Sequence, residues 1–327
     1  MDQLSTTDGR QPPNPAVITV LGPRSPRPGG VVDAHAHLWI SPPDGVRAPD
    51  APVLNDEPAI VAELTELRAE GGSGAIDCQP PGAGRDPEKL AAISRATGLE
   101  IVASTGFHLE RYYPPDAWTW TASPEELADR FAAELTLGME SPDGRRTAHP
   151  AGVIKTAHPG ALTDPRYVRL FAAACEASRR TGAAILVHTE QGRGVEGLVE
   201  FFLREGISPT RVVLCHVDKR PDPALHRELA AAGFLLEFDT FLRPKYEPET
   251  RVWPLLEGLL QEGVSGAVAC ALDLADAAQW RFRSGGPGML GLIRIVRPRL
   301  ERLGVAPEEI AALLGGNIYG RIARPAG

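Results

Sequence analysis

Short apolar runs alternate with longer amphipathic stretches along this chain of 327 residues. Short runs rich in β-branched residues are typical of strands, whereas apolar positions spaced three and four apart indicate helices. Strands are predicted at residues 31–34, 74–78, 100–104, 152–155, 184–188, 212–215, 234–238 and 267–271. Helices are predicted at residues 57–70, 87–97, 124–137, 165–181, 195–205, 223–232 and 249–262. Strands that alternate with helices favour a parallel sheet built from βα units.

The boundaries of the predicted helices carry start signals. Several helices begin with a polar capping residue followed by proline, at Asp86-Pro87, Ser123-Pro124 and Asp164-Pro165. A cap and a proline in the first turn favour such a start. Eight strands are the number that a (β/α)8 TIM barrel requires, and this fold needs about 250 residues. We therefore predict an α/β protein with the TIM-barrel fold.

One domain accounts for the whole pattern, because no internal repeat and no break in composition divides the chain. Residues 1–16 are predicted to form a flexible N-terminal tail, and residues 17–327 a single TIM-barrel domain. Glycines at the start of residues 284–298 predict a long loop after the last strand. A helix over residues 307–322 is predicted to close the barrel.

Composition narrows the class of function. The apolar fraction of 43% and the charged fraction of 23% are ordinary for a globular protein. A formal net charge of −8 argues against nucleic acid or an anionic membrane as a partner, but a local cationic pocket could still bind a small anionic substrate. The sequence has no signal peptide and no transmembrane run, and its four widely spaced cysteines are typical of reduced thiols. We therefore expect a cytoplasmic protein.

Residues with metal-binding side chains close several predicted strands. His35 and His37 end the first strand as His-x-His, which points both imidazoles to one side because strand side chains repeat with period two. His188 and His216 close or follow the fifth and sixth strands, and Asp273 follows the eighth. Alone, a His-x-His pair is common by chance, and His188 or His216 is equally well explained as a hydrogen-bonded histidine at the barrel rim. Because the carboxyl ends of barrel strands meet at one face, together they predict a metal site there.

Lys155 ends the fourth predicted strand, after an apolar run. A buried ammonium without a partner costs free energy, and a protonated amine is a poor metal ligand. If the amine reacts with carbon dioxide, the resulting carbamate has two oxygens that can bridge two metals. A solvated lysine at the strand end is the alternative. Cys215, which precedes His216, is expected to point away into the packing around the barrel.

With these strand ends in place, the sequence resembles the phosphotriesterase family of the amidohydrolase superfamily. The resemblance runs from about Val17 to Ala323. Its supporting segments include Gly84-Arg85-Asp86-Pro87, Thr105-Gly106-Phe107, His188-Thr189-Glu190 and His216-Val217-Asp218. The resemblance implies a metal-dependent hydrolase that acts on ester bonds in a small molecule, and a homodimer.

The resemblance also implies two divalent metal ions, usually zinc. The implied ligands are His35, His37, Lys155, His188, His216 and Asp273. The first two histidines and the aspartate would hold the more buried ion, and the last two histidines the more exposed one. An N6-carboxylated Lys155 and a hydroxide would bridge them, since two cations give hydroxide from water near neutral pH. The hydroxide would attack the ester, and Asp273 would take its proton and pass it to the leaving group.

The prediction of a substrate rests on the segment after the seventh strand. Arg243-Pro244-Lys245-Tyr246 resembles the Arg-x-Lys-Tyr motif of the branch that opens phosphorylated sugar lactones. In that branch the two cations and the tyrosine hydroxyl bind the substrate phosphate, a task that suits a guanidinium fork, an ammonium and a phenol. A solvated basic loop is the alternative. We therefore predict that Arg243, Lys245 and Tyr246 bind the substrate.

The segment after Asp273 departs from that branch. The branch continues with Met-Gly-Arg, whereas this chain has Leu274-Ala275-Asp276. A basic residue that would help to bind substrate is missing there, or displaced to Arg281. Hydrolysis of a phosphotriester or another organophosphorus ester is therefore the alternative function. A metal-binding but inert protein is a third hypothesis, which the complete set of ligand residues argues against.

Overall fold

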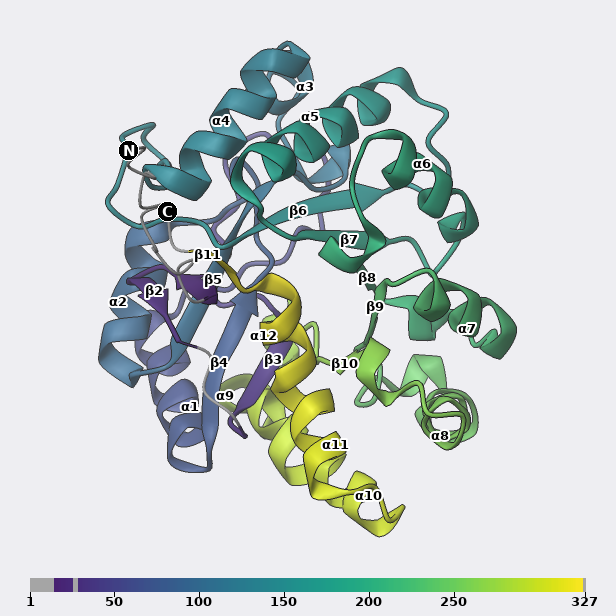
Figure 1. Ribbon diagram of the computed structural model, residues 1–327. Helices are drawn as coiled ribbons and strands as arrows, with labels where there is room; N and C mark the ends of the chain where they lie inside the picture. Colours follow the sequence, from purple (N-terminus) through teal and green to yellow (C-terminus); the bar gives the residue numbers. More distant parts are fainter. Residues whose placement is uncertain (1–14, 26–28, 326–327) are drawn as a thin grey trace, which may run out of the picture.

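The structure, a computed structural model, describes residues 15–25 and 29–325. Its main sheet has eight parallel strands in sequential order (Figure 1). The strands are β3 (Val31–Ala36), β4 (Gly72–Asp77), β5 (Glu100–Gly106), β6 (Val153–His158), β7 (Ile185–Thr189), β8 (Val212–Cys215), β9 (Leu235–Phe238) and β10 (Val268–Cys270). This sheet confirms the predicted TIM barrel. Residues 1–14 of the predicted tail lie outside the described residues, and Pro15 already belongs to strand β1.

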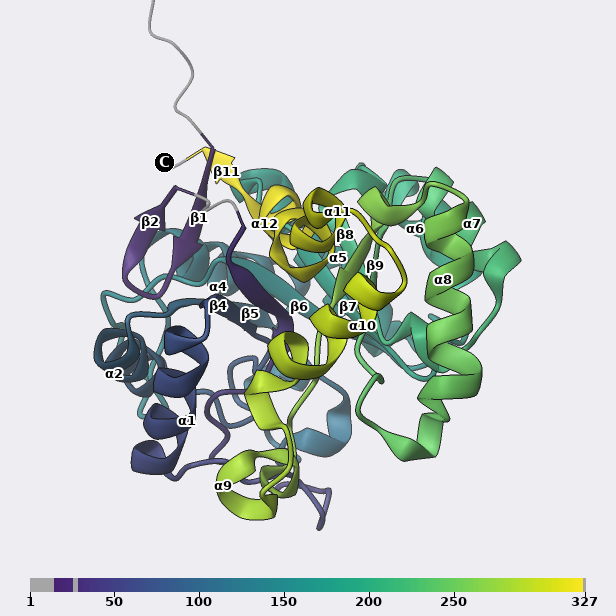
Figure 2. The same ribbon diagram turned by 90° about the horizontal axis from the view of Figure 1, so that it is seen from below.

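Helices connect successive strands and cover the outside of the sheet. They are α1 (Glu57–Ala69), α2 (Pro87–Thr97), α3 (Trp118–Thr121), α4 (Pro124–Thr136), α5 (Pro165–Thr181), α6 (Leu198–Arg204), α7 (Pro223–Ala231) and α8 (Trp253–Gln261). Helices α1 and α2 lie on one side of the barrel, and α6, α7 and α8 on the other (Figure 2). The predicted caps are present, because the side chains of Asp86, Ser123 and Asp164 each accept a backbone N–H of the first turn. No helix in the described part of the chain is long and apolar enough to cross a membrane.

The barrel closes between β3 and β10 through contacts at their carboxyl ends. The backbone N–H of Asp273 donates to the carbonyl of His35 at 2.9 Å. The buried Asp33 carboxylate accepts the backbone N–H groups of His35 and Leu272, both at 3.1 Å. One side chain therefore fixes both strand ends, which places His35 beside Asp273.

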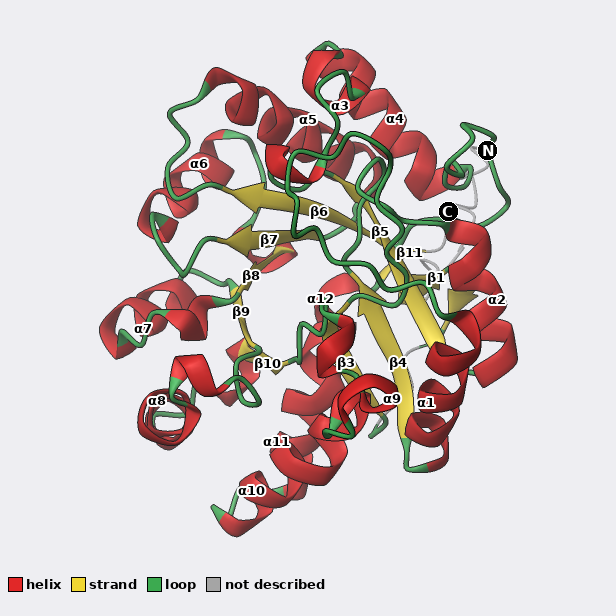
Figure 3. Cartoon of the chain, turned by 180° about the vertical axis from the view of Figure 1, so that it is seen from behind, coloured by secondary structure: helices red, strands yellow, loops and turns green. Residues whose placement is uncertain are grey.

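The amino end of the barrel is closed. Small and apolar side chains from all eight strands fill the interior and meet Val17, Ile318 and Ile322 below it. Helix α12 (Asn317–Ile322) lies across this end in Figure 1, beside a small sheet of β1 (Pro15–Thr19), β2 (Gly22–Arg24) and β11 (Arg324–Pro325). Figure 3 shows the opposite face, where loops cross in front of the strand ends. A binding site inside the barrel can therefore open only at that carboxyl face.

The predicted loop over residues 284–298 is wrong. Helix α9 (Arg281–Ser284) precedes this segment, and short helical turns run from Gly288 into α10 (Arg297–Arg302). The glycines are confined to the start of the segment, and the apolar positions after them bury Leu292, Val296 and Leu300 against the barrel. The predicted helix over residues 307–322 is interrupted, because non-helical backbone at positions 314 and 315 separates α11 (Pro307–Ala311) from α12.

Candidate active site

A cavity of about 670 Å³ opens at the carboxyl end of the barrel. Most of the predicted site residues line it: His35, His37, His188, His216, Arg243, Lys245, Tyr246 and Asp273. Lys155 is fully buried beneath the cavity, where its ammonium donates to Nε2 of His35 at 3.0 Å. The structure thus brings all the predicted residues to one place.

An extra residue in β3 turns His35 and His37 into the barrel. Three steps along β3, from Asp33 to Ala36, match two steps along β4, so the strand contains a bulge. Ala34 packs inside the barrel, and regular alternation would then send His35 outward. With the bulge, Ala36 packs on the outer side and both histidines point inward.

A left-handed backbone at His216 has the same effect at the end of β8. Its φ angle is 65°, in a region that residues other than glycine seldom adopt. Cys215 already points into the interior cluster, so the turn brings two consecutive side chains inward. The prediction that Cys215 packs around the outside of the barrel is therefore wrong. It assumed strict alternation up to the histidine.

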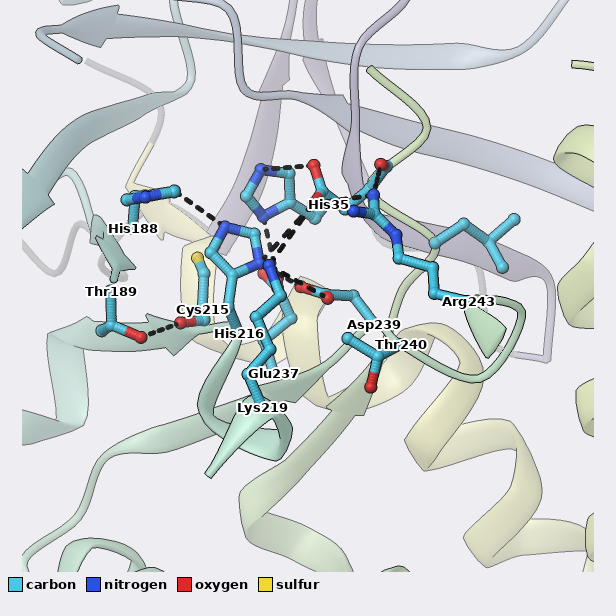
Figure 4. A network of polar contacts seen from close by, with 12 residues as sticks. His35, His188, Thr189, Cys215, His216, Lys219, Glu237, Asp239, Thr240 and Arg243 are labelled. Atoms are coloured by element: carbon cyan, nitrogen blue, oxygen red, sulfur yellow. Dashed lines mark hydrogen bonds and ion pairs between the residues drawn. The ribbon is translucent and has the colours of Figure 1, made fainter. Parts of the chain in front are cut away.

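Five of the six predicted ligands form two neighbouring groups. Donor atoms of His35, His37 and Asp273 all lie within 4.8 Å of one another, and Nε2 of His37 is 3.6 Å from Oδ1 of Asp273. Beside them, Nε2 of His216 is 2.9 Å from Nδ1 of His188, and Figure 4 shows the two rings facing each other. The resemblance assigns the first group to one ion and the second group to another.

Each histidine at the centre has a partner for its second ring nitrogen. The partners are Glu237 for His35, Gln79 for His37, Glu190 for His188 and Asp239 for His216. An acceptor on one ring nitrogen fixes the proton there and leaves the lone pair of the other free. Nδ1 of His188 and Nε2 of His216 then face each other as two lone pairs. A cation between them would remove this repulsion, so the donor set fits a metal.

The electrostatics of the cavity also suit metal binding. Burial lowers the pKa of all four histidines, that of His37 to about 4, so the rings are neutral near pH 7. Burial alone would raise the pKa of Asp273. The guanidinium of Arg243, 2.8 Å from its Oδ2, and the ammonium of Lys219, 3.8 Å from the same oxygen, offset this and hold that pKa below its usual range. The site therefore offers neutral imidazoles and an ionised carboxylate.

Glu190 offers a test of these outer partners, the side chains that bind the second ring nitrogen of each histidine. Its Oε1 accepts from Nε2 of His188 at 2.9 Å. We expect Glu190→Ala to weaken metal binding by about 10–100-fold, because an outer carboxylate orients its histidine and raises its basicity. Competition with a chromogenic chelator on metal-free protein measures this effect. Glu196→Ala is the matched control, since Glu196 pairs with Arg220 outside the cavity. Equal affinities in the two variants would contradict the role of Glu190.

Several site residues went unnoticed in the sequence. Lys219 lies three residues after His216, and its ammonium is 3.8 Å from Oδ2 of Asp273. Glu237 and Asp239 project from the end of β9, where charged residues inside an apolar run were an available signal. The small number of lysines was a second signal for the site. The chain has four lysines, and all but Lys89 lie in or beneath this cavity.

The cationic side of the cavity combines segments after β8 and β9. The ammonium groups of Lys245 and Lys219 lie 5.0 and 5.5 Å from the ring centre of Tyr246. Arg243 also lines the cavity, but its guanidinium is bound to the carboxylate and the carbonyl of Asp273. Lys219 lies 3.9 and 3.8 Å from carboxylate oxygens of Asp239 and Asp273, so the exposed Lys245 is the cation with the most freedom to contact an anion.

The fold and this constellation define a TIM-barrel hydrolase. The chain belongs to the phosphotriesterase family, which it matches over residues 15–319. It is 28% identical to a phospho-furanose lactonase of Mycoplasmopsis synoviae, over 91% of this chain and 89% of the relative.

Solved structures agree with this assignment. The crystal structure of an amidohydrolase from Mycoplasma synoviae superposes with a TM-score of 0.87 and 27% identity, covering 95% of this chain and 92% of the other. The phosphotriesterase homology protein of Escherichia coli, complexed with phosphate in its active site, superposes with a TM-score of 0.80 and 25% identity, covering 90% and 99%. The protein is accordingly a hydrolase that acts on ester bonds.

Proposed function

We propose that this protein is a metal-dependent lactonase that opens a small phosphorylated sugar lactone. The observation that carries the proposal is the grouping of Lys219, Lys245 and Tyr246 on one side of the cavity, next to Asp273. An ammonium pair and a phenol suit a phosphate, and the hydrolytic centre lies within reach of the same small molecule. The similarity to a phospho-furanose lactonase supports this substrate class, as does the phosphate in the active site of the Escherichia coli relative.

The ligand set supports two divalent ions. His35, His37 and Asp273 would hold one ion, and the facing nitrogens of His188 and His216 the other. Zinc suits imidazole nitrogen and carboxylate oxygen. Lys155 would join both groups as a carbamate, since its amine points at His35 from below. When bound, two such ions supply an activated water and a Lewis acid for the carbonyl oxygen.

The residues of the chain have defined tasks in the reaction. The carboxylate of Asp273 accepts the proton of the attacking water. The bond between the carbonyl carbon and the ring oxygen then breaks, and Asp273 returns the proton to that oxygen, which leaves a hydroxy acid. Arg243 keeps the carboxylate ionised and oriented. Lys219 and Lys245 hold the phosphate at the side of the ring.

Lys245→Met tests the substrate class. We expect kcat/KM for a phosphorylated γ-lactone to fall about 10–100-fold, because a hydrogen bond to a charged group contributes about 1.5–3 kcal/mol. Hydrolysis of the same lactone without its phosphate should be unchanged. Lys89→Met is the matched control, since Lys89 pairs with Glu57 outside the cavity.

The same assay separates lactone opening from the alternative activity. Rates on a lactone panel, with and without phosphate, are compared with the rate on an aryl phosphotriester. Failure of the metal-loaded protein to open any lactone would overturn the proposal. A higher kcat/KM on the phosphotriester than on every lactone would favour the alternative.

A further inference from the structure

His108 lies on the wall of the cavity opposite the cationic side. It follows β5, the third strand of the barrel, whereas Arg243 and Lys245 follow β9, the seventh. Strands three and seven are half a turn apart in a ring of eight, with the proposed metal ligands between them. A substrate whose phosphate contacts Lys245 would therefore extend across the centre toward His108.

The ring of His108 has a fixed protonation pattern. Its Nδ1 accepts the backbone N–H of Leu109 at 2.7 Å, so in the neutral ring the proton is on Nε2. Within residues 15–25 and 29–325 the His108 ring makes its one hydrogen bond through Nδ1, and the side chain lines the cavity, so Nε2 is left to the cavity. The ring therefore presents one N–H donor to whatever the cavity binds.

Packing holds this donor in place. The ring centre of His108 is 4.6 Å from that of Tyr112 and 4.8 Å from that of His188. Its backbone N–H donates to the hydroxyl of Tyr113 at 2.9 Å. A donor fixed before binding loses little entropy when it meets its acceptor, which makes the contact selective.

The surroundings of His108 suit a neutral polar group. Glu190 lines the same cavity, and its carboxylate lies 3.7 Å from the guanidinium of Arg111 in the loop after β5. The charges of Glu190 and Arg111 offset each other, so this wall offers no free cation to an anion, whereas a hydroxyl can accept from the imidazole and donate to the carboxylate.

We propose that Nε2–H of His108 donates a hydrogen bond to a ring hydroxyl of the lactone, and so selects hydroxylated lactones. This inference rests on the proposed lactonase function. His108 would be a substrate-binding residue that determines specificity, on the wall opposite the phosphate.

The test combines an enzyme variant with a substrate variant. His108→Phe keeps a ring between Tyr112 and His188 but removes the donor, and His108→Gln keeps an N–H at similar reach. Each is assayed on two γ-lactone phosphates that differ only in their ring hydroxyls. We expect His108→Phe to lower kcat/KM about 10-fold for the hydroxylated lactone and to leave the deoxygenated one unchanged. His108→Gln should recover most of the loss, and metal content should equal that of wild type.

The outcomes separate this inference from the function on which it rests. Suppose that the wild type opens both lactones. If His108→Phe then slows both reactions equally, or slows neither reaction, the role of His108 is refuted and the lactonase function stands. If the wild type opens neither lactone, the function fails and this inference with it. If the phenylalanine variant does not accumulate, His108→Leu serves as the donor-free variant. Calorimetric binding of the ring-opened hydroxy acid should show the same selective loss.

Discussion

Replacing Asp273 with asparagine is expected to lower kcat by about 10²–10⁴-fold, the usual contribution of a general acid–base group. The side-chain amide cannot take a proton from the attacking water, and it is a weaker metal ligand than a carboxylate. The backbone bond from Asp273 to His35 does not involve the side chain, so the barrel should still close. Circular dichroism and thermal unfolding are expected to show a folded protein.

Asp276→Asn is the matched control for this experiment. Asp276 lines the same cavity three residues later, and its side chain caps a short helical turn by accepting the N–H of Ala278 at 2.9 Å. Its replacement should change kcat little. Turnover near the wild-type value in Asp273→Asn, or an effect on KM alone, would remove Asp273 from the proton-transfer step.

Lys155→Met is expected to abolish turnover and to prevent binding of both metal ions. Lys155 is fully buried below His35, and methionine has a similar length but cannot form a carbamate. A buried ammonium costs free energy, so without metal the variant should be at least as stable as wild type. Added metal should raise the melting temperature of wild type but not that of the variant, because a ligand that binds only the folded state stabilises it.

Metal content by mass spectrometry and melting curves with and without zinc measure this effect. Lys89→Met, on the surface, should respond to metal as wild type does. Labelled bicarbonate supplied during reconstitution should give a carbamate signal by NMR in wild type only. Full metal content and metal-dependent stabilisation in Lys155→Met would refute the proposed role of the lysine.

The order of polar residues along the chain was sufficient to predict the barrel and to group the candidate ligands. Five of the eight apolar runs end in or just before a residue whose chemistry does not fit a core, such as Lys155 or His188. In a parallel barrel the position along the chain sets the position around the ring, so residues at strand ends converge without further information. The segment at residues 284–298 was predicted wrongly because a few glycines outweighed the helical spacing of the apolar residues after them.

The partner of His35 was harder to predict, because it depends on which strand lies across the barrel. Glu237 and His35 are 202 positions apart in sequence but lie 2.8 Å apart in the structure. The scarcity of lysine, with only four in the chain, was visible in the sequence. Only the structure shows that Lys219 lies near Lys245, because β8 and β9 are neighbours in the ring.

The sequence by itself determined which side chains end the strands, and therefore which chemistry gathers at the carboxyl face. The direction in which those side chains point was decided by the tertiary structure. Period-two alternation places His35 and His37 on one side, but the bulge against β4 makes that side the interior. At His216 a left-handed residue overrides alternation. Both features arise from pairing with a neighbouring strand and from closure of the ring, which no local pattern along the chain encodes.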